Sequence, residues 1–114
     1  MIKNKVKTKW QKKEIVLNSF LSIPNTFTAE IMSEQGYDAL TIDYQHGMIG
    51  FSDLFKMLQS IRNSGVTPIC RVSGLDHAVI SKVMDAGALG IICPMINNKA
   101  VSYTHLTLPT ICSV

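Results

Sequence analysis

Long apolar stretches, paired cysteines and a basic body are all missing from this sequence. No run approaches the roughly 18 consecutive apolar residues of a membrane span, so the sequence predicts no transmembrane helix. The three cysteines are odd in number and show no CxxC spacing, which argues against both a disulfide framework and a zinc ribbon. No apolar h-region with a small-residue cleavage site follows the basic N-terminus, so we expect no secretory signal and a cytoplasmic protein.

Most of the positive charge lies at one end of the chain. Eleven basic and eight acidic residues give a net charge of +3, and six of the basic residues are Lys3, Lys5, Lys7, Lys9, Lys12 and Lys13. The rest of the chain carries five basic and eight acidic residues, or −3, and lacks the basic surface of a nucleic-acid-binding module. We therefore expect residues 1–14 to form a basic N-terminal tail, either solvated or folded as a first amphipathic turn. We expect no nucleic-acid or membrane partner.

The apolar residues follow a repeating strand–helix pattern. Near-continuous apolar runs predict four strands, at residues 15–23, 39–42, 66–70 and 89–93. Three helical segments lie between them, and each ends just before a glycine that can take the left-handed conformation: Gly36, Gly65 and Gly87. The repeat predicts an α/β fold with a parallel sheet covered by helices. The repeat alone does not distinguish a barrel segment from a small doubly wound sheet. The 114 residues fall short of the roughly 250 that a closed barrel needs.

Each helical segment has an apolar face, and two have a start signal. Ser52 and Asp76 are expected to be the N-caps of the second and third helices. The apolar positions at helical spacing are Phe27, Ile31 and Met32 in the first helix, Leu54, Phe55, Leu58 and Ile61 in the second, and Val79, Ile80, Val83 and Met84 in the third.

Polar side chains stand where the predicted strands end. Asp43 and His46 follow the second strand, Arg71 follows the third, and Ser22 follows the first. Carboxyl ends of parallel strands meet at one rim, so a carboxylate, an imidazole and a guanidinium are expected to converge there. This set suits carbanion chemistry next to a carbonyl: Arg71 would hold an enolate or carboxylate oxygen, and His46, oriented by Asp43, would move a proton. The pattern also allows turn residues that satisfy backbone groups, and a rim ion pair.

Asp85 lies in the last turn of the third predicted helix, where a carboxylate opposes the helix dipole. This placement predicts a partner for Asp85, either in a neighbouring subunit or in a local donor.

Five blocks of the sequence, in order and at matching spacing, resemble the N-terminal part of the HpcH/HpaI aldolase family of class II pyruvate aldolases. The blocks are FLSIP (20–24), GYD (36–38), DYQHG (43–47), PICRV (68–72) and DAGALGIICPM (85–95). The resemblance covers about residues 15–100. It implies the N-terminal portion, about four strands and three helices, of a (β/α)8 barrel of the phosphoenolpyruvate/pyruvate type. It also implies reversible cleavage of a 2-oxo-4-hydroxy acid to pyruvate and an aldehyde, in catabolism of aromatic compounds or sugar acids.

The resemblance also implies roles for single residues. His46 corresponds to the catalytic histidine, and Asp43 to the aspartate paired with it. Arg71 corresponds to the arginine that binds pyruvate and stabilises its enolate. Asp85 matches an aspartate near the active site at a subunit interface, as expected for a homo-oligomer. Gln45 is a substrate-binding position at which many members carry Glu.

The family uses a divalent metal, Mg²⁺, Mn²⁺ or Co²⁺, held by a Glu and an Asp on later strands. These ligands have no counterpart in this sequence up to residue 100, so we expect the chain itself to be inactive. The alternatives are a citrate-lyase-type acyl lyase of the same superfamily and a catalytically inactive binding fragment.

The resemblance ends after residue 100. Residues 101–110 (VSYTHLTLPT) match one reading frame of the transposase adapter used to build sequencing libraries. We therefore interpret residues 101–114 as a non-native, adapter-derived tail. A genomic continuation through codon 101 in the same frame would contradict this interpretation.

Overall fold

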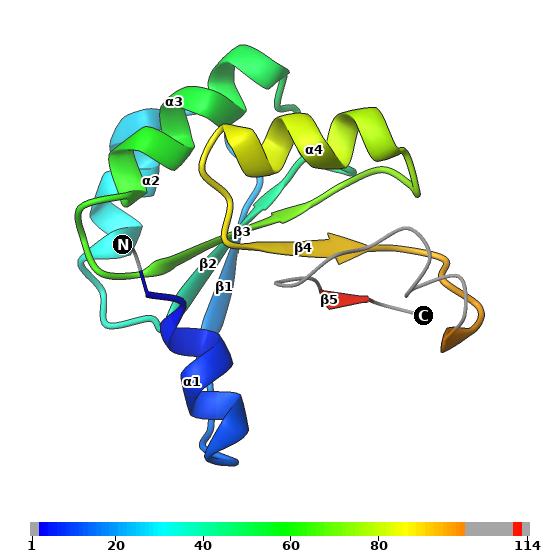
Figure 1. The fold of residues 1–114 in the computed structure, drawn as a ribbon. Helices are drawn as coiled ribbons and strands as arrows, with labels where there is room; N and C mark the ends of the chain where they lie inside the picture. The colour runs from blue at the N-terminus through cyan, green and yellow to red at the C-terminus, as the bar shows by residue number, and fades with distance from the viewer. Residues whose placement is uncertain (1–2, 100–110, 113–114) are drawn as a thin grey trace.

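The computed structural model describes residues 3–99 and 111–112, which form one parallel sheet with helices (Figure 1). The elements are α1 (Lys5–Gln11), β1 (Asn18–Leu21), α2 (Thr26–Ser33), β2 (Ala39–Asp43), α3 (Phe51–Ile61), β3 (Thr67–Arg71), α4 (His77–Asp85), β4 (Gly90–Cys93) and β5 (Ile111–Cys112). The strands pair in chain order and all pairs are parallel. The predicted α/β class is confirmed. Apart from β5, the interpreted tail at residues 101–114 lies outside the described residues.

Successive side chains of each strand point to opposite faces of the sheet, and the two faces pack differently. On one face Leu40, Ile42, Cys70 and Ile91 join the main core beneath the helices. The helices α2, α3 and α4 lie together on that side of the sheet (Figure 1). Ala39 and Ile69 belong to a separate small cluster. The registers place Asp43 beside Arg71 and Thr41 beside Ile69, so the last residues of β2 and β3 share the face of this second cluster.

Helix α1 covers the beginning of the second face. Val6 is buried and packs with Ala39 and Ile69. Asn4 caps the helix by accepting a bond from the Lys7 N–H, and its own Nδ2 donates to the carbonyl of Leu89 at 2.9 Å. The N-terminal segment was expected to be a solvated tail or an amphipathic turn, and its residues Lys5–Gln11 form a packed amphipathic helix. No helix among the described residues is long and apolar enough to cross a bilayer.

The helix boundaries match the pattern at the C-termini and differ at one N-terminus. Gly36, Gly65 and Gly87 all have positive φ, as expected for residues that end a helix. Asp76 caps α4 and accepts bonds from the N–H groups of Ala78 and Val79, so that prediction is confirmed. The prediction of Ser52 as the second N-cap is wrong. The N-cap is Gly50, two residues earlier, whose backbone is extended, and helix α3 begins at Phe51, so Ser52 already lies inside the first turn.

The helix faces also differ from the pattern. Phe27 and Ile31 are 67% and 45% exposed, whereas α2 buries the small residues Ala29 and Ser33. Small side chains permit the close approach of α2 to α3, which turns the larger apolar residues of α2 outward. Phe55 is likewise 46% exposed.

Candidate active site

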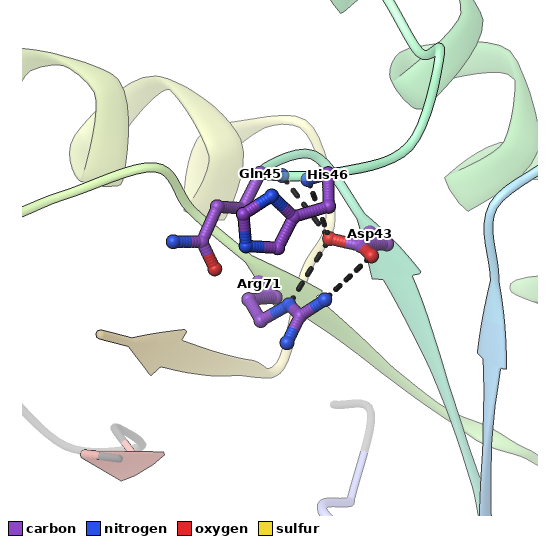
Figure 2. A network of polar contacts seen from close by, with 4 residues as sticks. All are labelled: Asp43, Gln45, His46 and Arg71. Carbon is purple, nitrogen blue, oxygen red and sulfur yellow. Dashed lines mark hydrogen bonds and ion pairs between the residues drawn. The ribbon is translucent and has the colours of Figure 1, made fainter. Parts of the chain in front are cut away.

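The register of β2 and β3 brings a carboxylate and a guanidinium together. Asp43 and Arg71 are the last residues of their strands and are direct partners in the parallel ladder. Asp43 Oδ1 accepts from Arg71 Nε at 3.0 Å, and Oδ2 accepts from Nη2 at 2.6 Å (Figure 2). The Asp43 side chain is 6% exposed and that of Arg71 is 27% exposed. Two parallel bonds fix the guanidinium in the plane of the carboxylate.

The same carboxylate holds the loop after β2. Asp43 Oδ1 accepts from the backbone N–H groups of Gln45 at 3.2 Å and His46 at 3.0 Å. The Gly47 N–H donates to the Asp43 carbonyl oxygen at 3.1 Å. A Cβ atom at Gly47 would collide with that oxygen and would also come within 3.3 Å of the Ser22 Cα. Only glycine fits this tight turn, which sets Gln45 and His46 over the ion pair and beside the end of β1.

Electrostatics keep both partners charged. The Arg71 hydrogen bonds hold the pKa of Asp43 below its usual value, burial opposes this effect, and the His46 N–H adds to the lowering. The bonds to Asp43 in turn raise the pKa of Arg71. The pair is therefore ionised at neutral pH.

Four of the predicted site residues lie together in the structure. Asp43, Gln45, His46 and Arg71 gather where β2 and β3 end (Figure 2). The expected orientation of the His46 imidazole by Asp43 differs from the observed geometry, because Asp43 bonds the backbone N–H of His46 and directs its carboxylate to Arg71. The His46 side chain is exposed above the pair.

The structure does not bring Asp85 to this rim. Helix α4 runs opposite to the strands, so its last turn lies at their amino ends. There Asp85 lines a pocket of about 300 Å³ together with Val66, Pro68 and Leu89, which stand at the starts of β3 and β4. Within one chain Asp85 and Arg71 therefore lie at opposite ends of the sheet, and a shared site would need another subunit.

Sequence reasoning missed Phe20. Its ring centroid lies 5.0 Å from Arg71 Cζ, within the range of a cation–π contact. Residues 15–23 form a near-continuous apolar run, which gives no sign of the two faces of the strand. Strict alternation from Asn18 would have placed Phe20 on the same face as the last residues of β2 and β3.

The described residues do not fit a metal site. They contain no group of three or more His, Cys, Asp and Glu side chains that could hold an ion. The carboxylate at the rim, Asp43, has both oxygens engaged by Arg71 and by backbone N–H groups. Cys70 and Cys93 are buried in the core cluster beneath the helices.

The parallel strand–helix sheet, with an arginine–aspartate pair at the carboxyl ends of its strands, defines an α/β protein with a candidate site where such folds bind their ligands. The sequence model of the family described as HpcH/HpaI aldolase/citrate lyase matches residues 17–104, so the chain belongs to this family.

Two curated relatives are aldolases. The chain is 41% identical over 101 residues to a hydroxypyruvate/pyruvate aldolase of Rhizorhabdus wittichii, a match that covers 89% of this chain and 40% of the relative. It is 33% identical over 82 residues to a 2-dehydro-3,6-dideoxy-6-sulfogluconate aldolase of Pseudomonas putida, covering 72% of this chain and 32% of the relative. The chain thus spans about 40% or less of the length of these relatives. It belongs to a family of lyases.

Solved structures show the same fold. An HpcH/HpaI aldolase/citrate lyase family protein from Burkholderia cenocepacia superposes with a TM-score of 0.79 at 25% identity, over 88% of this chain and 40% of that one. Citrate synthase SbnG superposes with a TM-score of 0.77 at 30% identity, over 84% of this chain and 39% of that one. The fold is the N-terminal portion of a barrel of this type, and both the fold class and the family expected from the sequence are confirmed.

Proposed function

We propose that this chain forms the N-terminal part of an aldehyde-lyase that reversibly cleaves a 2-oxo-4-hydroxy acid to pyruvate and an aldehyde. The observation that supports it most is the fixed Asp43–Arg71 pair at the rim, in a chain whose curated relatives are aldolases. Such a pair presents a planar, permanently charged donor group to the oxygens of a 2-oxo acid.

In this proposal each rim residue has a distinct task. Arg71 bonds Asp43 through Nε and Nη2, which leaves Nη1 outside the pair to donate to a carboxylate or enolate oxygen. His46, exposed above the pair, moves a proton to or from the substrate. Gln45, half-buried beside them, contacts the substrate.

The activity also needs groups outside the described residues. A divalent metal, Mg²⁺, Mn²⁺ or Co²⁺, would supply Lewis-acid stabilisation of the enolate, and its carboxylate ligands would lie beyond residue 100 in the full-length protein. We therefore expect the 114-residue chain to be inactive. Asp85 lies away from this rim and would act at the interface of a cytoplasmic homo-oligomer.

A second candidate is a citrate-lyase-type acyl lyase with the same 2-oxo acid site. The resemblance to citrate synthase SbnG favours it, since that protein's name indicates chemistry on a tricarboxylate. The two candidates differ in substrate. The first predicts pyruvate from a 2-oxo-4-hydroxy acid, and the second predicts cleavage or formation of a citryl compound.

The experiment compares this chain with the full-length protein of the gene that encodes residues 15–100. Pyruvate is followed with lactate dehydrogenase, in the presence of a 2-oxo-4-hydroxy acid and each metal. We expect none from the chain and metal-dependent pyruvate from the full-length protein, abolished by R71K and unaffected by the matched change R62K. Equal activity of the R71K protein would contradict the proposal, and turnover of citryl substrates alone would favour the second candidate.

A further inference from the structure

The Arg71 guanidinium contacts side chains from two strands besides its own. Asp43 on β2 accepts two hydrogen bonds from the edge of the guanidinium, and the ring centroid of Phe20 on β1 lies 5.0 Å from Arg71 Cζ. Because the strand order is β1-β2-β3, Arg71 must lean across β2 to reach Phe20. In the register, Phe20 stands beside Thr41, two residues before Asp43. The ring therefore lies deeper along the sheet than the carboxylate.

Asp43 alone restrains one motion of the guanidinium only weakly. Two parallel hydrogen bonds fix its position against the carboxylate, but they resist tilting of the guanidinium, by hinging about the line through the two carboxylate oxygens, only weakly, because both donor–acceptor distances are kept in that motion. An aromatic face beneath the cation opposes that tilt, because attraction to the ring is strongest over its centre. The direction of Nη1, which Asp43 does not bond, depends on this tilt.

We propose that Phe20 is a positioning residue for Arg71, holding the guanidinium so that Nη1 is directed at the oxygens of the 2-oxo acid. This inference rests on the proposed function for the ligand, but the contact itself is independent of it. Phe20 is 46% exposed, so its ring is not simply core filling.

The chain offers an internal assay for this role. It contains two arginines, Arg62 and Arg71, of which Arg62 is exposed on the helical side. The arginine-selective reagent phenylglyoxal, followed by peptide mass spectrometry, gives the modification rate of Arg71 relative to Arg62 in the same sample. Alkylation of the buried Cys70 by iodoacetamide reports whether the fold has opened.

The variants are Phe20→Leu, which removes the ring, and Phe20→Trp, which keeps an aromatic face. Phe55→Leu is the matched control, because Phe55 is also 46% exposed but lies on α3. We expect F20L to raise the Arg71:Arg62 rate ratio by roughly twofold to fivefold, as loss of a partly exposed cation–π contact would. F20W and F55L should keep the wild-type ratio, and Cys70 should stay unmodified throughout.

An unchanged ratio in F20L would overturn the proposal, as would a rise of equal size in F20W. A rise accompanied by Cys70 alkylation would show a structural role only and would overturn it too. Millimolar pyruvate should slow Arg71 modification in the wild-type chain. If pyruvate gives no protection, the proposed function is contradicted, while the rate ratio still decides the role of Phe20.

Discussion

Replacing Asp43 by asparagine should destabilise the chain much more than an ordinary surface substitution. The change removes the charge and leaves an amide N–H₂ facing the Arg71 donor that now lies 2.6 Å from Oδ2. Breaking a fully buried ion pair costs about 3–5 kcal/mol, whereas exposed pairs are worth about 0–1 kcal/mol. Asp43 is 6% exposed, but Arg71 at 27% can recover some hydration. We therefore expect a loss of about 2–3 kcal/mol, or roughly 10 °C in Tm.

The assay is urea denaturation followed by circular dichroism, with D53N as the matched control. Asp53 stands in the first turn of α3, where its carboxylate interacts with the helix dipole, so its loss should cost under about 1 kcal/mol. The double variant D43N/R71Q should be only slightly less stable than D43N, since the two changes remove one interaction. A D43N chain within about 0.5 kcal/mol of wild type would refute the claim that this pair holds the rim together.

Three further predictions concern acid stability, the first helix and a buried thiol. The pKa values of Asp43 and Asp38 are lowered from 3.8, so their stabilisation is complete above that pH and is lost as the pH falls through the lower folded values. The free energy of unfolding, measured between about pH 2 and 5, should fall with pH, and it should fall less in D43N than in the wild-type chain. Identical pH profiles of the two chains would contradict this prediction. V6A should cost about 2 kcal/mol in urea unfolding, because Val6 is 2% exposed; a cost near zero would mean that α1 is not packed. Burial raises the pKa of the Cys70 thiol to about 12, so alkylation at pH 8 should label it only after unfolding; native labelling would contradict its burial.

The sequence was sufficient for the order of β1 to β4 and α2 to α4 and for the residues that follow the C-termini of those helices. Apolar runs and glycines are local signals, and the positive φ angles of Gly36 and Gly65 show why those positions end helices. The identity of the core face of α2 could not be predicted in the same way. Apolar spacing indicates Phe27 and Ile31, but the close packing of α2 on α3 selects small residues such as Ala29 instead.

The rim was predictable as a set of residues but not as a set of contacts. Strand ends indicate which side chains meet, so Asp43, His46 and Arg71 could be grouped. Which of them pair depends on the strand register, a property of two segments 28 residues apart that no local pattern encodes. The register sets Asp43 directly beside Arg71, so the carboxylate pairs with the guanidinium and the His46 imidazole stays exposed. Asp85 differs in this respect, because a helix that connects two parallel strands runs back to their amino ends, so the predicted repeat already implied that its last turn lies away from the rim.

The claim that the Asp43–Arg71 rim holds a 2-oxo acid is tested most directly by isothermal titration of the 114-residue chain with pyruvate, without metal. We expect weak, saturable binding to the wild-type chain, lost in R71K because lysine cannot reproduce the planar donor pair, and retained in R62K. Equal affinity of the R71K and wild-type chains for pyruvate, or no binding to either, would contradict the account.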